Sequence, residues 1–139
     1  MRKQLVRFGI SLDQQLLQTF DRYLMRKGYA TRSEAIRDLI REALVAQEWR
    51  DDQETVGTIT LVYVPHRPGL VRQLTEVQHR SGSLILANAH VHLDAHHCLE
   101  VIIVRGKSTA LQALANSLIS TKGVLHGKLT MTTTGIPLT

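Results

Sequence analysis

The sequence is poor in the features that mark disulfide-bonded, membrane-spanning or secreted proteins. Its 139 residues include one cysteine, so no disulfide can form within the chain and a reducing compartment is expected. No run approaches the roughly 18 apolar residues that span a bilayer. The N-terminus lacks the apolar stretch of a signal peptide. We therefore expect a soluble, cytoplasmic protein.

Aromatic residues make up 4% of the chain, so aliphatic side chains must fill the interior. The hydrophobic share of 43% is enough for one ordinary domain or two small ones. Lysine and arginine outnumber acidic residues by 17 to 12, a formal net charge of +5. This excess suits a polyanionic partner, although it also serves plain solubility.

The stretch 5–12 alternates between apolar and other side chains, which predicts a half-buried β-strand. One face carries Val6, Phe8, Ile10 and Leu12, and the other carries Arg7, Gly9 and Ser11. The following segment, up to about residue 50, looks helical and offers no partner strand. The same strand of a second molecule supplies that partner most easily, so we expect a dimer.

Two helices are predicted after this strand. Asp13 can cap a helix that ends at Gly28, with apolar residues at helical spacing between them. Thr31 and Glu34 form a capping box at the start of the second helix. The N–H groups and the dipole at that start make a ready phosphate site, and arginines add positive charge nearby.

The second half of the chain begins after a strongly polar stretch, 47–54, which we interpret as a linker or a frayed helix end. The expected elements beyond it are strands at 58–64, 84–93, 98–104 and 124–133 and helices at 70–82 and 108–121. The order βαββαβ predicts a ferredoxin-like antiparallel sheet with two helices on one face, so the other face needs cover or a partner. The fold class is therefore α+β.

Residues of the types that bind metals lie around the predicted hairpin. His90 and His92 share one face of a strand, because side chains alternate across a sheet. If residues 94–96 form the loop, Cys98 lies opposite His92 and Glu100 lies opposite His90, with Cβ atoms about 4.5–5.5 Å apart. Imidazole and thiolate are ligands of zinc, nickel and copper.

Three ligands from one hairpin would leave a fourth position for water, a remote residue or another chain. Glu100 is a candidate acceptor that fixes the orientation of the His90 ring. The alternative is a partly exposed hairpin whose histidines only satisfy local hydrogen bonds and whose cysteine packs as a small apolar residue.

The predicted order of the first half is a strand, a helix, a glycine turn and a capped helix, and the strand needs the same strand of a second chain as its partner. This order resembles the ribbon-helix-helix DNA-binding fold. We assign that domain to residues 1–46. The resemblance implies an antiparallel ribbon of two chains in the major groove, where Arg7 and Ser11 contact bases. Gly9 departs from the short polar residue usual in the family, so one contact is missing or made by backbone. Arg32 and Ser33 would hold phosphate at the helix start.

Two motifs extend the resemblance over nearly the whole chain. They are Gly28-Tyr29 followed by Arg32-Ser33-Glu34-Ala35-Ile36-Arg37-Asp38, and His90-Val91-His92 followed by Cys98-Leu99-Glu100. A ribbon-helix-helix domain joined to a βαββαβ domain with these motifs resembles the NikR family of nickel-responsive transcriptional regulators. In that family the second domain, 55–139 here, resembles the ACT regulatory fold and assembles four chains as a dimer of dimers.

The NikR resemblance implies a square-planar Ni(II) site, one ion per chain, between two second domains. His90, His92 and Cys98 match three of its ligands. His79 matches the fourth, which comes from the helix before the hairpin on the neighbouring chain. Tyr63 aligns with a residue that packs near the site in relatives.

The resemblance also implies a second, weak cation position at Glu34 and Asp38, seen in relatives bound to DNA; an exposed acidic pair is the alternative. The expected function is a repressor of nickel uptake genes that binds a palindromic operator in double-stranded DNA when nickel is bound, and not an enzyme. The residues by themselves leave open a repressor that senses another metal or an amino acid, a toxin-binding antitoxin, and a zinc hydrolase with water in the open position.

Overall fold

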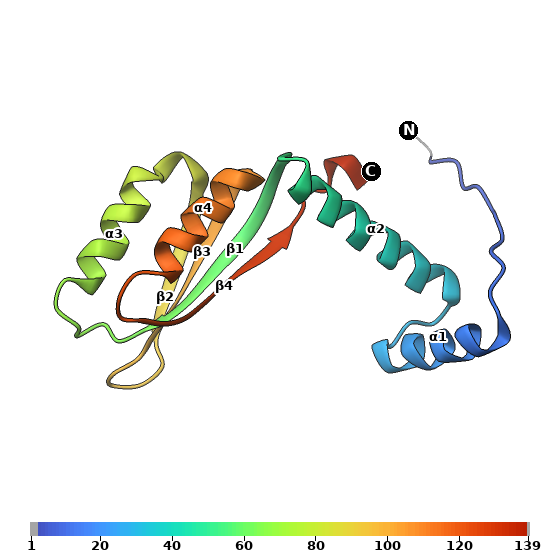
Figure 1. Ribbon diagram of the computed structural model, residues 1–139, viewed down its shortest axis with the longest axis horizontal. Helices are drawn as coiled ribbons and strands as arrows, with labels where there is room; N and C mark the ends of the chain where they lie inside the picture. The colour runs from blue at the N-terminus through green and yellow to red at the C-terminus, as the bar shows by residue number, and fades with distance from the viewer. Residues whose placement is uncertain (1–2, 139) are drawn as a thin grey trace. The chain divides into compact units, whose positions relative to one another are not determined.

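The computed structural model describes residues 3–138. The chain divides into two compact units, one ending at Ile40 and the other beginning at Arg41 (Figure 1). Among the described residues, no helix combines the length and the apolar character that crossing a membrane requires.

The first unit consists of an irregular N-terminal segment, one whole helix and the first part of a second helix. Residues 3–12 form neither helix nor strand within the single chain, and Phe8 is 72% exposed. The helix α1, Gln14–Lys27, begins where Asp13 accepts a hydrogen bond from the Leu16 N–H at 2.9 Å, and it ends at Gly28 with φ +82°. The predicted caps of α1 are confirmed. The strand predicted at 5–12 is not formed inside one chain, and its pairing with a second chain stays a prediction.

The helix α2, Arg32–Arg50, starts with a modified capping box. Thr31 Oγ1 accepts from the Glu34 N–H at 3.2 Å, as predicted, but the Glu34 carboxylate accepts from the N–H of Ala30 and not of Thr31. The helix continues into the polar stretch 47–54, because Trp49 in its last turn is 4% exposed and belongs to the core of the second unit.

The second unit has the predicted βαββαβ order, which confirms the α+β fold class. Its strands are β1 (Glu54–Tyr63), β2 (Ile85–His92), β3 (Cys98–Lys107) and β4 (Val124–Thr132), and its helices are α3 (Leu70–Arg80) and α4 (Ser108–Ile119). Short 3-10 turns occupy Gly82–Leu84 and Ile136–Leu138. The sheet is antiparallel with the strand order β2-β3-β1-β4.

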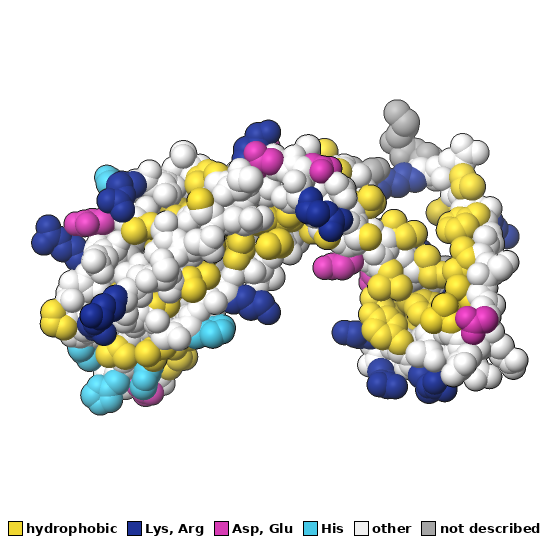
Figure 2. Space-filling model, viewed as in Figure 1, with side chains coloured by type: hydrophobic (Ala, Val, Ile, Leu, Met, Phe, Trp, Pro, Cys, Tyr) yellow, Lys and Arg dark blue, Asp and Glu magenta, His cyan; other side chains and the backbone are white. Residues whose placement is uncertain are grey.

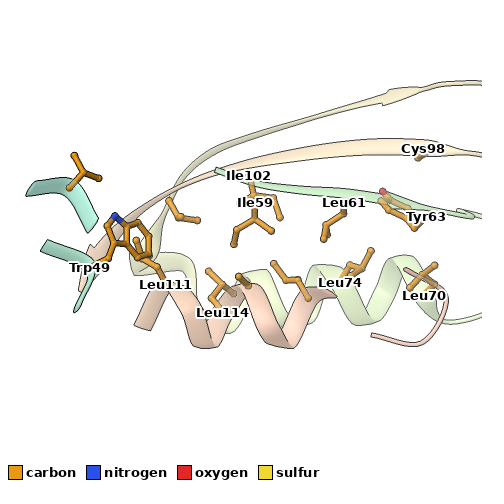
Figure 3. Close-up of a cluster of buried hydrophobic side chains, with 14 residues drawn as sticks. Trp49, Ile59, Leu61, Tyr63, Leu70, Leu74, Cys98, Ile102, Leu111 and Leu114 are labelled. Carbon is orange, nitrogen blue, oxygen red and sulfur yellow. The ribbon is translucent and has the colours of Figure 1, made fainter. Parts of the chain in front are cut away.

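The core lies between one face of the sheet and the helices α3 and α4 (Figure 3). Burial alternates along β1, with every second residue from Thr55 to Tyr63 buried, as expected for a sheet covered on one side. Trp49 lies at one end of this layer, and Tyr63 and Cys98 lie at the other. On the opposite face, Val91 is 54% and Ile103 is 39% exposed, so that face keeps apolar surface in contact with solvent.

The ladder between β2 and β3 positions the hairpin residues. His92 pairs with Cys98 and His90 pairs with Glu100, which confirms the predicted register. The register shifts between Ile85 and Ala87, so Leu86 is one extra residue on β2, a β-bulge.

Candidate metal centre and DNA-binding residues

His90, His92 and Cys98 meet on one face at the end of β2 and the start of β3. The Cys98 Sγ lies 3.2 Å from His92 Nδ1. The rings of His90 and His92 have centroids 6.0 Å apart and an interplanar angle of 79°. Alternation along β2 explains why both imidazoles share the face, and the cross-strand pairing adds the thiol. Two imidazoles and a thiol are donors that suit nickel, zinc or copper, so the residues present fit a metal ion.

The thiol and the imidazoles differ in their access to solvent. Cys98 is 1% exposed, whereas His90 and His92 are exposed. Tyr63 pairs with Cys98 across β1 and β3 and is 5% exposed. Burial, reinforced by the nearby Glu100 and Cys98, raises the pKa of Tyr63 to about 12, so its phenol stays protonated at neutral pH. This end of the core is therefore closed at the thiol and open at the imidazoles.

Two amide side chains that the sequence analysis missed hold Glu100 opposite His90. Glu100 Oε2 accepts from Gln78 Nε2 at 3.2 Å, and Glu100 Oε1 accepts from Asn88 Nδ2 at 3.4 Å. Asn88 also donates to Gln78 Oε1 at 2.9 Å, so side chains from β2, β3 and α3 form a closed ring. Burial raises the pKa of Glu100, while the Gln78 hydrogen bond and His90 oppose the rise. Asn88 could have been found from its position two residues before His90, on the same face.

Asp94 orders the turn between β2 and β3. Its Oδ1 accepts from the backbone N–H groups of His96 and His97 at 2.7 and 2.9 Å, and its Oδ2 lies 2.8 Å from His97 Nδ1. These bonds, led by that of the His96 N–H, lower the pKa of Asp94. His66 Nε2 lies 3.1 Å from Ala95 O and so ties the β1–α3 loop to the same turn. Figure 2 shows histidine side chains gathered at this end of the second unit.

One chain does not complete a metal site. Within residues 3–138, no three His, Cys, Asp or Glu side chains come close enough together to hold an ion. His92 and Cys98 are in contact, and His90 lies beside them. His79 lies exposed in the last turn of α3, and its assignment to a neighbouring chain's site stays a prediction.

The acidic pair on α2 has local partners. Glu34 Oε2 accepts from the Ala30 N–H at 3.3 Å, and Asp38 Oδ2 accepts from the Tyr29 hydroxyl at 2.8 Å. The Asp38 hydrogen bond is the main reason that the pKa of Tyr29 is raised. Both carboxylates therefore stabilise the start of α2, whether or not they also bind a cation.

The N-terminal segment presents the predicted base-contacting residues. Arg7, Gly9 and Ser11 are exposed. A cavity of about 580 Å³ lies against this segment and α2, and it is lined by Leu5, Val6, Arg7, Phe8, Ile10, Ser33, Ile36, Arg37 and Ile40. Alternation predicts that Arg7 points away from Val6 and Phe8. In the single chain, Arg7 lines the same cavity as Val6 and Phe8, so the segment does not show the two separate faces of a strand at this position. Figure 2 shows the hydrophobic side chains gathered on this unit.

Arg32 and Ser33 lie in the first turn of α2, as predicted, and both are exposed. Their surroundings differ. Ser33 lines the apolar cavity, whereas the guanidinium of Arg32 forms an ion pair with Asp21 of α1 at 2.9 Å. The sequence analysis missed Asp21, because no local spacing rule connects residues on two different helices.

An irregular segment and two capped helices, followed by a βαββαβ domain with a thiol–imidazole pair, fit the class of two-domain metal-dependent DNA-binding regulators. Comparisons with known proteins agree. Residues 56–132 match the NikR C terminal nickel binding domain, and residues 6–47 match the ribbon-helix-helix protein, copG family. The chain belongs to the NikR family, which is one of transcription regulators and not of enzymes.

Relatives match along most of the chain. A protein of Geobacter sp. (strain M21) that carries the name nickel-responsive regulator is 58% identical over 131 residues, 94% of each chain. A protein of the same name from Nitratidesulfovibrio vulgaris (strain Miyazaki F) is 53% identical over 135 residues, 96% of this chain and 97% of that protein. Among solved structures, an uncharacterized protein, TM1266, from Thermotoga maritima covers 57% of this chain and 98% of its own with a TM-score of 0.51 and 20% identity, a likeness of fold.

Proposed function

We propose that this chain is a nickel-responsive transcription regulator in which Ni(II), one ion per chain, promotes binding to a palindromic operator. The observation that carries the proposal is the 3.2 Å contact between Cys98 Sγ and His92 Nδ1, with His90 on the same face. Relatives that cover nearly the whole chain are named as regulators that respond to nickel. A repressor of nickel uptake genes, working in the cytoplasm, is the specific form that we propose.

The ligand set in this proposal is His90, His92 and Cys98 of one chain with His79 of the partner subunit. A metal ion held by the exposed imidazoles could take a further ligand from outside the chain, while the buried thiol fixes the inner side of the site. Glu100, held by Gln78 and Asn88, would orient the His90 ring, and Tyr63 would close the site beside the thiol. Bound nickel would supply a link between chains.

Nickel binding can be coupled to DNA binding only if the ion binds two arrangements of the chains with different affinity. An ion that binds both arrangements equally does not change their relative populations. Assembly is therefore part of the proposal. The exposed apolar side chains of segment 5–12 suit pairing with a second copy, which builds the DNA-binding dimer. The open face of the sheet, with Val91 and Ile103, suits the association of two dimers. Glu34 and Asp38 would serve a second, weak cation.

The test is the retention of random duplex DNA by the purified protein at one fixed moderate salt concentration, with and without one equivalent of Ni(II) per chain. Salt is fixed because phosphate contacts alone change affinity strongly with ionic strength. We expect nickel to enrich a two-fold symmetric sequence. The His92→Ala variant should lose the enrichment, while His126→Ala, which alters an exposed histidine of β4 outside the site, should keep it.

Parallel arms with Zn(II) and Cu(II) separate nickel sensing from general metal sensing, because thiolate and imidazole also suit those ions. Sequence-specific binding that is indifferent to every metal would contradict the sensor and leave only a DNA-binding regulator. A weight-average mass corresponding to one chain in solution would contradict the proposed assembly.

A further inference from the structure

The ion pair between Arg32 and Asp21 has a geometry that fixes the guanidinium. Arg32 Nε donates to Asp21 Oδ1 at 2.9 Å, and Arg32 Nη2 donates to Asp21 Oδ2 at 2.9 Å. Two parallel donors on two carboxylate oxygens form the fork that makes arginine–carboxylate pairs directional. The hydrogen bond and the attraction lower the pKa of Asp21 and raise that of Arg32. The pair joins α1 to the first residue of α2.

This position matters because the start of α2 is where a phosphate would bind. The helix dipole and the first N–H groups favour an anion there, and a free arginine would add a full positive charge. Among residues 3–138, Arg7 and Arg37 of the same unit make no ion pair. The charge of Arg32, in contrast, is cancelled by a carboxylate in contact with it.

Exchange of the carboxylate for a phosphate would bring little net gain. The guanidinium would trade one anion for another, and the Asp21 carboxylate would be left without its partner near a phosphate, where like charges repel. The side chains of Arg32 and Asp21 are 57% and 37% exposed, so the pair is screened by solvent and worth little to folding. Its main consequence is therefore for what Arg32 can bind.

We propose that Asp21 is a positioning residue that withholds Arg32 from DNA phosphates and thereby lowers the sequence-independent part of DNA affinity. The proposal rests on the DNA binding proposed above. It places Arg32 outside the set of phosphate contacts in the native protein and leaves that role to Ser33 and the backbone at the start of α2. An acidic residue on α1 then makes binding depend more on base contacts and less on charge.

The experiment measures the affinity of the full-length, nickel-loaded protein for one random-sequence duplex across a salt series. The variants are Asp21→Asn, which removes the carboxylate charge, and Asp21→Asn/Arg32→Gln, which also removes the released cation. Glu42→Gln is the matched control, because it removes the same charge from an exposed residue of α2 that makes no ion pair among the described residues. Thermal melts check that each variant is folded.

Each phosphate newly neutralised adds about 0.9 to the magnitude of the slope of log K against log salt. Each DNA-binding dimer carries two copies of Arg32, so each dimer bound to the duplex should make the Asp21→Asn slope steeper by about 1.8. The affinity of the variant then falls about 12-fold more per bound dimer between about 50 and 200 mM salt than that of the native protein. The double variant and Glu42→Gln should keep the native slope. Asp21→Asn should tighten random and operator DNA by the same factor, because phosphate contacts carry no sequence information.

An unchanged slope for Asp21→Asn would mean that the freed Arg32 adds no phosphate contact, and a shallower slope for the double variant would mean that Arg32 already contacts phosphate. Either result would overturn the inference while the proposed function stands. A native protein that retains no DNA at low salt, with or without nickel, would instead overturn the proposed function and the inference together.

Discussion

Replacement of Trp49 by phenylalanine should destabilise the second unit by an amount that the structure allows us to estimate. The Trp49 Nε1–H donates to Thr132 O at 2.8 Å, and the side chain is 4% exposed. Loss of the hydrogen bond costs about 1 kcal/mol. The smaller ring buries roughly 40 Å² less apolar surface, about another 1 kcal/mol. We therefore expect the free energy of unfolding to fall by about 2 kcal/mol, or Tm by about 10 °C.

The measurement is urea unfolding followed by far-ultraviolet circular dichroism at a fixed protein concentration. Fluorescence cannot serve, because Trp49 is the one tryptophan of the chain. Tyr23→Phe is the control, since Tyr23 is 39% exposed and its substitution should change stability by less than about 0.5 kcal/mol. A Trp49→Phe variant as stable as this control would refute the view that Trp49 fastens the end of α2 to the sheet.

Two further predictions concern the same unit. Asp52 accepts from the Thr109 N–H at 2.9 Å, which is the main reason that its pKa is lowered. A carboxyl whose pKa is lowered by folding stabilises the folded protein at pH values above its unfolded pKa of 3.8, and this contribution is lost as pH falls through the folded pKa. Asp52→Asn should therefore be less stable than the native protein at neutral pH and should lose that deficit in acid. A deficit in urea unfolding that does not depend on pH would contradict this. Gly57→Ala should cost about 1–3 kcal/mol, because an added Cβ would lie 2.8 Å from Thr130 O, which is backbone. Gly9→Ala, with nothing within 4 Å, should unfold like the native protein, and an equal loss in both variants would point to a general effect of alanine.

Local patterns were sufficient for the parts of the fold that depend on neighbouring residues. Residue type and spacing alone identify Asp13 and Gly28 as the caps of α1, because a cap acts on N–H or C=O groups within one turn. The alternation of His90 and His92 and the loop between the strands were enough to predict the pairing with Glu100 and Cys98. The ligand types in the hairpin followed from that register.

Contacts between distant segments were not accessible in this way. Trp49 and Glu48 are buried in a stretch that reads as polar, because β4 and the residues after it cover them, and Thr133 donates to Glu48 at 3.2 Å. The ion pair of Arg32 with Asp21 joins two helices. The Gln78 amide that donates to Glu100 comes from α3. In each case the partner is distant in the sequence, so only the folded chain reveals it.

The extra residue that the bulge adds to β2 changes which residues of the strand share a face of the sheet. Ile85 packs against the core, and Asn88, His90 and His92 pair with residues of β3 that are buried on the same side, Ile102, Glu100 and Cys98. In a regular strand, residues 85 and 90 would point to opposite faces. Leu86 absorbs the difference, so Ile85 and His90 share a face although their numbers differ in parity. A deletion of Leu86 would leave the pairing with β3 on both sides of it intact. A deletion at residue 89 would instead make Asn88 and His90 consecutive, so that their side chains would point to opposite faces of the sheet. The tolerance of this strand to a change in length is therefore concentrated at one position.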